Sequence, residues 1–338
     1  MRSIGSSVWI GAVLVAGALV GFYFAANSGG ALARTVGGAT TGVAETSTAS
    51  RPMEPQTLCV LTANIRMPSP EDVEDSWAKR RELLIKTLLA QEADIIGIQE
   101  ATPAQTAYLL NNLKGYELTN RSETPNPVPG GGGGGGMLAP LSDMMGSLNQ
   151  IYYRVDRFRL LAAEGGPLRP EAPQGNLTEN TYYTLAVLAD VQKAFANLIV
   201  VDTHLRHGDK NAEICAERIH RKIAQAKLKY PEAQVVLLGD MNHGRNSEVW
   251  QQLVAAKSTT PLRDTHDYAA MSPQQPWGTY HAFAGKPLGE WPIDLILVSA
   301  GLKAEAAIIV KAKDPETGHY PSDHFFVKTT IHPGKSLP

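Results

Sequence analysis

The amino-acid sequence predicts an α/β protein in which two packed β-sheets are covered by outer helices. Two observations support this prediction. Short apolar runs typical of buried strands recur along the chain, and stretches with helical spacing lie between some of them. At 338 residues the chain is long enough for one large domain or two small ones.

The strongest strand pattern is the apolar run 235–238. Such a run is typical of a strand buried on both faces, because no polar residue alternates with the apolar ones. Gly239 permits a sharp turn at its end, and Asp240 and Asn242 follow two residues apart, so their side chains can point the same way. Taken alone, this pair is equally consistent with a ligand site and with an ordinary polar turn.

The remaining elements are predicted from the same two periodicities. Strand patterns cover residues 57–63, 94–98, 151–153, 158–162, 182–190, 197–202, 293–298, 306–311 and 325–331. Helical spacing covers residues 77–90, 104–113, 209–229 and 247–253. We predict a hairpin around residues 154–157 and pairing of strand 182–190 with strand 197–202.

The first 55 residues are predicted to precede the folded domain. Arg2 lies before an uncharged apolar run, residues 8–26, and Ala31-Leu32-Ala33 offers a small-residue cleavage site. Residues 1–33 are therefore predicted to be a signal peptide or an N-terminal membrane anchor. Either one implies export, with the remainder secreted, periplasmic or anchored outside the membrane. Residues 34–55, rich in Gly, Thr, Ser, Ala and Pro, are predicted to form a flexible linker.

Residues 56–334 are predicted to form the folded domain. Within it, residues 120–147 are rich in glycine and proline and read as a loop insertion, since strand patterns resume on both sides. The net charge of −2 argues against a broadly basic surface for nucleic acid. Cys59 and Cys215 form no Cys/His cluster, so no structural zinc site is expected and free thiols are predicted.

Polar residues of types that bind metals and phosphates occur where the predicted strands begin or end. Any one of them is consistent with a turn or a capped strand end. The complete set, in this order, is harder to explain in that way: Asn64, Glu100, His204, Asp240, Asn242, Asp294, Asp323 and His324.

These residues belong to six motifs that resemble those of the endonuclease/exonuclease/phosphatase superfamily, which includes pancreatic deoxyribonuclease and bacterial sphingomyelinase. The resemblance extends over residues 56–331 and implies a four-layer α/β sandwich with two mixed sheets packed face to face. The motifs are Thr62-Ala63-Asn64-Ile65-Arg66, Asp94-Ile95-Ile96-Gly97-Ile98-Gln99-Glu100, Asp202-Thr203-His204-Leu205, Leu238-Gly239-Asp240-Met241-Asn242, Pro292-Ile293-Asp294-Leu295-Ile296 and Ser322-Asp323-His324.

The resemblance implies a metal site with oxygen ligands. Glu100, with Asn64 nearby, would hold a divalent cation, and Asp323 is a candidate for a second metal position or for polarising the site. Oxygen-only ligation suits Mg²⁺, with Mn²⁺ or Ca²⁺ as substitutes, rather than zinc.

The resemblance also implies catalytic roles. Asp240 would orient or deprotonate the attacking water, and Asn242 would place that water or a phosphate oxygen. His324 would contact the phosphate, with Asp294 holding its ring in the charged form. His204 would be a second phosphate-facing histidine or the leaving-group acid.

One motif departs from the family pattern. Relatives often carry a glutamate that pairs with the histidine equivalent to His204, and Ser147 stands at the corresponding position here. His204 either lacks this carboxylate or takes one from Glu123 or Asp143 in the Gly-rich loop.

Three residues are candidates for substrate binding. Arg206 follows His204 and could meet a second phosphate or a nucleic-acid backbone. Arg218 on the following helix could reach back toward the site or could be solvated. Tyr280, in a loop (residues 277–283) that resembles the pocket border of relatives, could stack on a base or sugar.

The sequence thus predicts a Mg²⁺-dependent phosphoester hydrolase of the phosphodiesterase or phosphatase type that acts outside the cytoplasm. Its partner would be a phosphoester substrate: a small molecule, a lipid head group or a nucleic acid. The membrane is a further partner if the N-terminal segment is uncleaved, and no obligate protein partner is evident. Two alternatives stay open. One is an extracellular nuclease that cleaves DNA or RNA, and the other is an inactive binding module of the same fold.

Overall fold

The structure is a computed structural model that describes residues 57–119, 149–169, 181–208, 211–245, 247–254, 258–267 and 278–334. The predicted export segment, the linker and the insertion at 120–147 lie outside the described residues, so these three assignments stay predictions. None of the described helices is long and apolar enough to cross a membrane. Cys59 and Cys215 are free thiols, as predicted.

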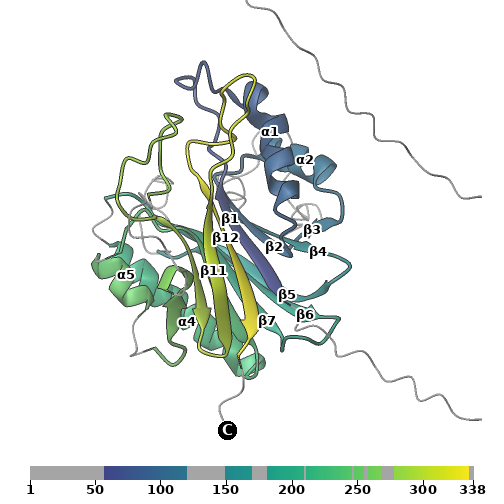
Figure 1. The fold of residues 1–338 in the computed structure, drawn as a ribbon. Helices are drawn as coiled ribbons and strands as arrows, with labels where there is room; N and C mark the ends of the chain where they lie inside the picture. The colour runs from purple at the N-terminus through teal and green to yellow at the C-terminus, as the bar shows by residue number, and fades with distance from the viewer. Residues whose placement is uncertain are drawn as a thin grey trace, which may run out of the picture. The chain divides into compact units, whose positions relative to one another are not determined.

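The strands form two mixed six-stranded sheets. The first has the order β11-β12-β1-β2-β4-β3, and Figure 1 shows β11, β12, β1 and β2 side by side. Its strands are β1 (Leu58–Asn64), β2 (Ile95–Gln99), β3 (Tyr116–Leu118), β4 (Gln150–Arg154), β11 (Leu302–Val310) and β12 (Phe326–Pro333). The second has the order β5-β6-β7-β8-β10-β9. Its strands are β5 (Phe158–Pro167), β6 (Tyr182–Asp190), β7 (Leu198–His204), β8 (Gln234–Asp240), β9 (Leu262–Asp264) and β10 (Asp294–Ser299).

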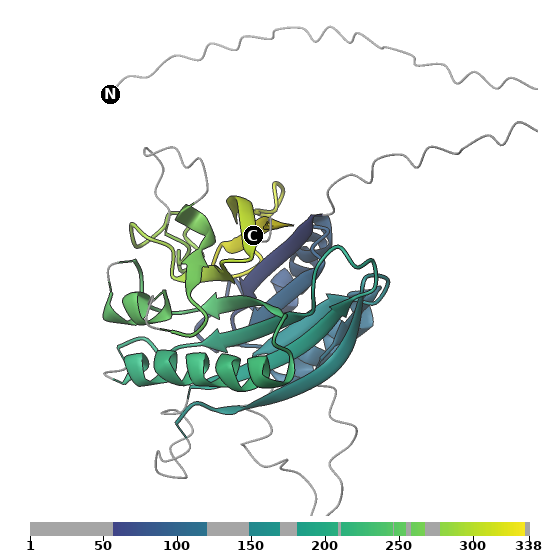
Figure 2. The same ribbon diagram turned by 90° about the horizontal axis from the view of Figure 1, so that it is seen from below.

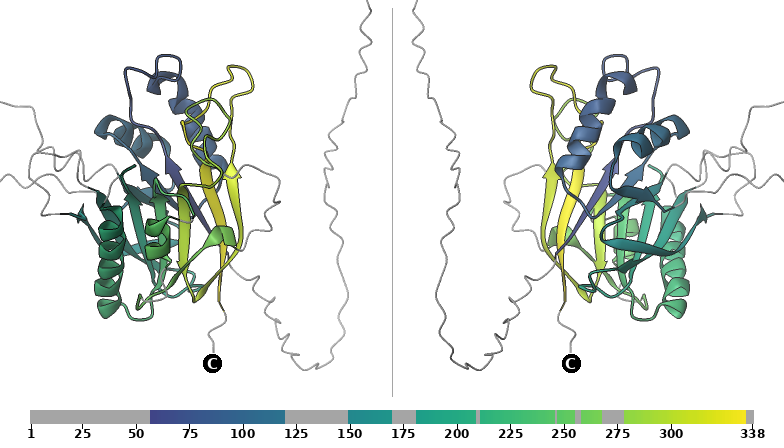
Figure 3. Two further views of the ribbon diagram at one scale, coloured as in Figure 1. Left: turned by 90° about the vertical axis from the view of Figure 1, so that its left-hand side faces the viewer. Right: turned by 90° about the vertical axis from the view of Figure 1, so that its right-hand side faces the viewer.

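Helices cover the outer face of each sheet. Helices α1 (Trp77–Ala90) and α2 (Pro103–Asn112) lie against the first sheet, and α4 (Ala212–Lys229) and α5 (Glu248–Leu253) lie against the second. Figure 2 shows α4 running along the outside of its sheet, and in Figure 3 α4 lies apart from α1 and α2 with strands between them. A short 3-10 helix, η2 (Thr265–Asp267), follows β9.

Three hydrophobic clusters give the molecule its four layers. In β8, Val235 and Leu237 belong to the cluster shared with α4, whereas Val236 and Leu238 belong to the cluster between the two sheets. A third cluster joins the first sheet to α1 and α2. Because alternate residues of a strand face opposite sides of its sheet, the unbroken apolar run of β8 is buried on both faces. The predicted four-layer α/β sandwich is confirmed.

The predicted hairpin around residues 154–157 is wrong. β4 pairs with β2 and β3 in the first sheet, while β5 pairs with β6 in the second, so the chain crosses between sheets at this turn. Local sequence shows two strands and a short turn, but it carries no information about which sheet each strand joins. The predicted pairing of the strands at 182–190 and 197–202 is confirmed by β6 and β7.

Strand pairing brings the predicted polar residues to one edge of the sandwich. β7 runs parallel to β8 with His204 opposite Asp240, and β10 runs antiparallel to β8 with Asp294 opposite Asp240. β1 runs parallel to β2, so Asn64 lies opposite Gln99, the residue before Glu100. Residues far apart in sequence therefore meet because the ends of neighbouring strands share an edge.

Gly239 is required where β7 and β8 approach each other near this edge. Its φ is 140°, and a Cβ atom at this position would lie 1.9 Å from the Thr203 carbonyl oxygen. Any larger residue would push β8 away from β7 and displace Asp240.

A buried polar cluster joins the two sheets behind the site. Gln99 Nε2 donates to Asp202 Oδ1 at 2.6 Å and to Thr62 Oγ1 at 3.1 Å. Asp202 is fully buried, and burial raises the pKa of its carboxyl well above the ordinary value, against the opposing effect of the Gln99 hydrogen bond.

Replacement of Asp202 by Asn is expected to change how stability depends on pH. An acid with a raised pKa in the folded state binds its proton more tightly there than when unfolded. The free energy of unfolding of the wild type therefore falls as pH rises from the unfolded pKa to the raised folded pKa. An Asn does not titrate, so the unfolding free energy of the variant relative to wild type should increase with pH across this window. Urea unfolding of both proteins over a pH series measures this difference in unfolding free energy. A difference that does not change with pH would contradict the raised pKa of Asp202.

Candidate active site

A pocket of about 520 Å³ opens at the edge where these strand ends meet. Seven of the eleven predicted site residues line it: Glu100, His204, Asp240, Asn242, Tyr280, Asp323 and His324. Two more, Asn64 and Asp294, are buried directly behind the lining and bonded to it.

The other two predicted residues do not line this pocket. Arg206 is exposed to solvent beyond the lining. Arg218 lies on α4 and donates through Nη1 to the Leu168 carbonyl at 2.7 Å. In this structure Arg218 thus supports the loop after β5 instead of reaching back toward the site, because α4 packs on the outer face of its sheet.

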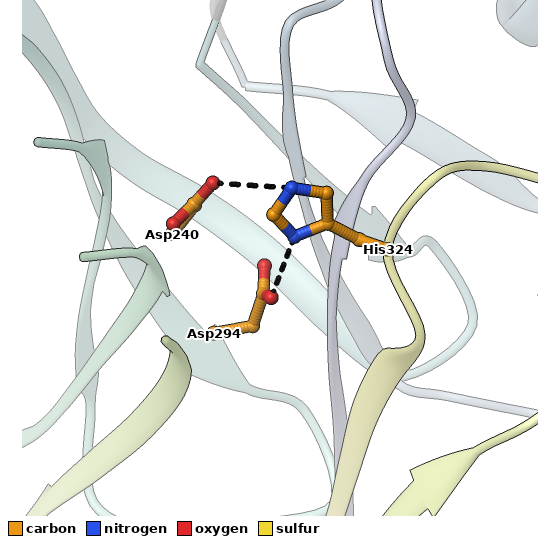
Figure 4. Close-up of side chains that lie close together, drawn as sticks. All are labelled: Asp240, Asp294 and His324. Atoms are coloured by element: carbon orange, nitrogen blue, oxygen red, sulfur yellow. Dashed lines mark hydrogen bonds and ion pairs between the residues drawn. The ribbon is translucent and has the colours of Figure 1, made fainter. Parts of the chain in front are cut away.

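His324 lies between two buried carboxylates (Figure 4). Its Nδ1 is 2.8 Å from Asp294 Oδ2, and its Nε2 is 3.8 Å from Asp240 Oδ2. Burial by itself lowers the pKa of His324, but the Asp294 and Asp240 carboxylates outweigh it and raise the pKa to about 10. His324 is therefore positively charged at neutral pH, with Nε2 directed toward Asp240.

Thr279 ties this pair to the rest of the pocket. Its hydroxyl accepts from the Ile293 and Asp294 backbone N–H groups at 3.1 and 3.2 Å. Its carbonyl accepts from the Phe325 N–H at 2.8 Å. The residue thus joins the start of β10 to the segment that carries His324. Thr279 belongs to the predicted pocket-border loop, residues 277–283, but no sequence pattern indicated that it would join these two segments.

Asn64 connects the two halves of the site. Its amide nitrogen donates to Glu100 Oε1 and to Asp240 Oδ2, both at 3.0 Å. Its Oδ1 accepts from the Arg66 N–H at 3.0 Å. The sequence predicts Asn64 beside Glu100 at a metal, but in this arrangement its nitrogen and not its oxygen points at the carboxylates.

Glu100 and Asp323 are two acidic side chains that line the same pocket. Glu100 has a φ of 65°, and its Oε2 accepts from the Met67 N–H at 2.9 Å. Asp323 is buried, and burial raises the pKa of its carboxyl, with Glu100 adding to the increase. The cation paired with Asp323 is Arg66, at 3.7 Å. Two oxygen donors in a negative, partly dry setting match the ligand preference of a hard divalent cation.

A second group has ligand atoms close enough for a metal. Atoms of Asp240, Asp294 and His324 lie within 4.8 Å of one another. Here, however, the charged imidazole already supplies a cation between the two carboxylates, and its Nδ1 is engaged by Asp294. The chemistry of the donors therefore favours Glu100 and Asp323 as the metal position.

Asn242 holds the His204 ring in place. Its amide nitrogen lies 2.8 Å from His204 Nε2 and also donates to the Leu205 carbonyl at 2.8 Å. His204 Nε2 also lies 3.4 Å from Asp240 Oδ2, so the ring is held beside the Asp240 carboxylate. Asn242 itself has a φ of 50°, with its N–H bonded to Asp240 Oδ1 at 2.9 Å. The predicted carboxylate partners of His204, at positions 123 and 143, and Ser147 lie outside the described residues.

One side of the pocket is apolar. Tyr280, Leu288 and Trp291 line it and are 38%, 65% and 40% exposed. The Leu288 N–H donates to the Tyr280 carbonyl at 2.9 Å, and the Arg245 guanidinium lies over the Trp291 ring, 5.8 Å from its centroid. Leu288 and Trp291 were not predicted from the sequence, since isolated apolar residues in a loop give no periodic signal.

Arg80 supports the loops above the pocket. It lies on α1 and is fully buried although it is charged. Its guanidinium donates to the Asp75, Ile65, Arg66 and Pro321 carbonyls at 3.0, 2.6, 2.6 and 3.1 Å. It thereby ties the segment after β1 to the segment that leads into Asp323 and His324. Backbone acceptors cannot be read from a sequence, which is why this burial was missed.

Comparison with known proteins agrees with the fold and shows the family. The model of the Endonuclease/Exonuclease/phosphatase family matches residues 61–324, and the chain belongs to this family. The resemblance stated from the six motifs is thereby confirmed. A comparison with curated protein sequences gives no match.

Several solved structures share the fold at low sequence identity. A family protein from Bacteroides thetaiotaomicron has 18% identity and a TM-score of 0.67, covering 84% of this chain and 98% of its own. A mannosyl-6-phosphatase from the same species has 19% identity and a TM-score of 0.65, covering 81% and 99%. TDP2 of D. rerio, complexed with a single-strand DNA product, has 18% identity and a TM-score of 0.55, covering 82% and 99%.

Proposed function

We propose that this chain hydrolyses a phosphoester by metal-assisted attack of water on phosphorus. The observation that carries the proposal is the convergence of Asp240 and the charged His324, 3.8 Å apart, beside the acidic pair Glu100 and Asp323 in one pocket. Membership of the family, and structural neighbours named as a phosphatase and as a DNA-product complex, support it.

Glu100 and Asp323 would hold the metal ion, with Mg²⁺ the expected ion and Mn²⁺ or Ca²⁺ as substitutes. When bound, the ion supplies charge neutralisation and polarisation at a phosphoryl oxygen. Asn64 acts beside it by fixing the Glu100 and Asp240 carboxylates relative to each other.

Asp240 would take the proton of the attacking water. Its Oδ1 is held by the Asn242 N–H at 2.9 Å and its Oδ2 by the Asn64 amide at 3.0 Å. A buried carboxylate held at both oxygens is positioned without reorganisation, as general base catalysis requires. His324, kept charged by Asp294, would donate to a phosphoryl oxygen and stabilise the charge that develops there.

His204 and Asn242 would complete the phosphate-facing side. Asn242 places a donor near the reacting oxygens. Asn242 Nδ2 lies 2.8 Å from His204 Nε2, so a role as leaving-group acid would require this nitrogen to turn from Asn242 to the leaving-group oxygen. Contact with the phosphate is the more direct use of this residue.

The apolar side of the pocket would receive the organic part of the substrate. Replacement of Trp291 by Ala is expected to raise KM for an aryl phosphate about 10-fold with little change in kcat, because stacking on an aromatic side chain contributes equally before and during the reaction. Steady-state kinetics with phenyl phosphate and methyl phosphate measures it. The Val155→Ala variant, changed at an exposed apolar residue outside the pocket lining, is the control. An equal change for both substrates would contradict the assignment.

The nuclease alternative has its own support in Tyr280 and Trp291, since exposed aromatic rings beside a phosphate site can stack on bases. Hydrolysis of bis-p-nitrophenyl phosphate, its monoester and plasmid DNA in the presence of Mg²⁺ separates the candidate reactions. We expect turnover of at least one small phosphoester. Turnover of none, with Mg²⁺ or Mn²⁺, would favour the inactive binding module.

The reaction is further proposed to occur outside the cytoplasm. This rests on the apolar run at 8–26 and the cleavage site at 31–33. A mature N-terminus at Arg34 in the expressed protein would establish cleavage, and an intact Met1 in the membrane fraction would establish anchoring.

A further inference from the structure

Arg66 borders the pocket in a backbone conformation that its surroundings enforce. It lies two residues after the end of β1 with a φ of 56°, in the left-handed region that non-glycine residues rarely adopt. Its carbonyl accepts from Arg80 Nη2 at 2.6 Å and from Gln105 Nε2 at 2.9 Å, and its N–H donates to Asn64 Oδ1. Glycine would adopt this conformation without strain, so the presence of an arginine points to a use for its side chain.

The Arg66 guanidinium is oriented by one carboxylate. Nε and Nη2 donate to the two oxygens of Asp72 at 3.0 and 3.2 Å, and Nε lies 3.7 Å from Asp323 Oδ2. Within the described part of the chain, Nη1 has no hydrogen-bond partner. The side chain is 29% exposed and lines the pocket with Glu100. A planar cation with unused N–H groups is therefore held beside the reaction centre.

Arg80 shows what a purely structural arginine looks like in the same region. It is fully buried and donates to four backbone carbonyls. Arg66 differs in both respects, since it is partly exposed and keeps donors free at the pocket. Support of the fold accounts for the buried donors of Arg80, whereas Asp72 holds Arg66 in place and leaves part of its guanidinium open to the pocket.

We propose that Arg66 binds an anionic phosphoryl oxygen that phosphodiesters lack, so that the site prefers dianionic phosphate monoesters. This inference rests on the proposed function and specifies its substrate class. A diester presents two non-bridging oxygens, which the proposed metal position and His324 can take. A monoester presents a third, and the planar guanidinium fork suits it in charge and geometry. Asp72 holds the fork ready for this oxygen.

Equilibrium binding tests the inference without turnover. Phenylphosphonate and its monomethyl ester differ by one anionic oxygen. Phenylphosphonate has no ester bond to cleave, and ³¹P NMR after each titration checks that the monomethyl ester has stayed intact. Binding of each is measured by calorimetry with Mg²⁺ present, at a pH where the phosphonate is doubly ionised. We expect the wild type to bind phenylphosphonate about 10-fold or more tightly than the ester.

Variants then test whether Arg66 causes the preference for phenylphosphonate over its ester. Arg66→Met is expected to lose about 10- to 100-fold in affinity for phenylphosphonate and about 2-fold or less for the ester, and Arg66→Lys is expected to lose less. Arg221→Met, changed at an exposed arginine on α4, is the matched control and should bind like wild type. Thermal unfolding of each variant checks its folding, and Arg66→Lys keeps a cation at the position if Arg66→Met is unstable.

Three results would overturn the inference: equal binding of the two probes by wild type, no binding of either, or equal losses for both probes in Arg66→Met. Failure of the proposed function has a different signature. It would appear as absence of turnover for every phosphoester while the difference between the two probes remains.

Discussion

Replacing Asp240 with Asn is expected to lower kcat by about 10²- to 10⁴-fold at neutral pH. The change is isosteric and keeps an oxygen for the Asn64 amide, which donates to Oδ2 at 3.0 Å. It removes the group that accepts the water proton, and loss of a positioned base usually has an effect of this size. Because the substrate is held by other groups, KM should change much less. Steady-state kinetics with the best phosphoester of the panel measures both constants.

Two further variants test this prediction, one at the proposed metal position and one at the surface as a control. Glu100→Gln should also lose most of its activity, and that loss should be partly relieved by raising the Mg²⁺ concentration, since the variant weakens the proposed metal position. Asp156→Asn, at a surface carboxylate paired with Arg154, should behave like wild type. Full activity in both Asp240→Asn and Glu100→Gln would show that the assigned mechanism is wrong.

Replacing Asp294 with Asn is expected to lower kcat by a similar factor, about 10²- to 10⁴-fold, for a different reason. Asp294 lies 2.8 Å from His324 Nδ1, and with Asp240 it raises the pKa of His324 to about 10. An opposite charge stabilises the protonated ring, so its removal must lower that pKa. A fraction of the enzyme would then carry a neutral His324, which has no positive charge to stabilise the phosphoryl oxygen.

The pH dependence separates this effect from simple misfolding. The wild type should lose the His324 proton with a pKa of about 10, whereas the alkaline limb of the kcat profile of Asp294→Asn should move to lower pH. NMR titration of the His324 ring protons in both proteins reports the same shift without turnover. An unchanged His324 titration in the variant would refute the role given to Asp294.

Much of the fold was predictable because burial leaves a periodic signal. The run at β8 is apolar on both faces, and each face packs into a different cluster, so this strand pattern predicts a sheet that is covered on both sides. The sheet membership of β4 and β5 was not predictable, because a turn of three residues between two strands looks the same whether or not the chain changes sheets.

Some residues of the site could likewise be predicted from the sequence, and others could not. Asp240, Asp294 and His324 could be named because each flanks a recognisable strand within a family motif. Arg66, Arg80 and Trp291 could not be assigned, because their positions depend on backbone carbonyls, a left-handed φ and a neighbouring guanidinium. Arg206 and Arg218 were predicted to bind substrate but do not line the pocket. The reason is related, since the sequence does not show which group an arginine side chain on a helix or loop will contact.

The isotope content of the product tests the central claim most directly. Hydrolysis of a phosphoester by the wild type in ¹⁸O-labelled water with Mg²⁺ is expected to place the label on the phosphate and leave the alcohol unlabelled. That result would mean that water attacks phosphorus. Label in the alcohol would mean attack at carbon, and an absence of any Mg²⁺-dependent product would mean no hydrolysis. Either result would contradict the account.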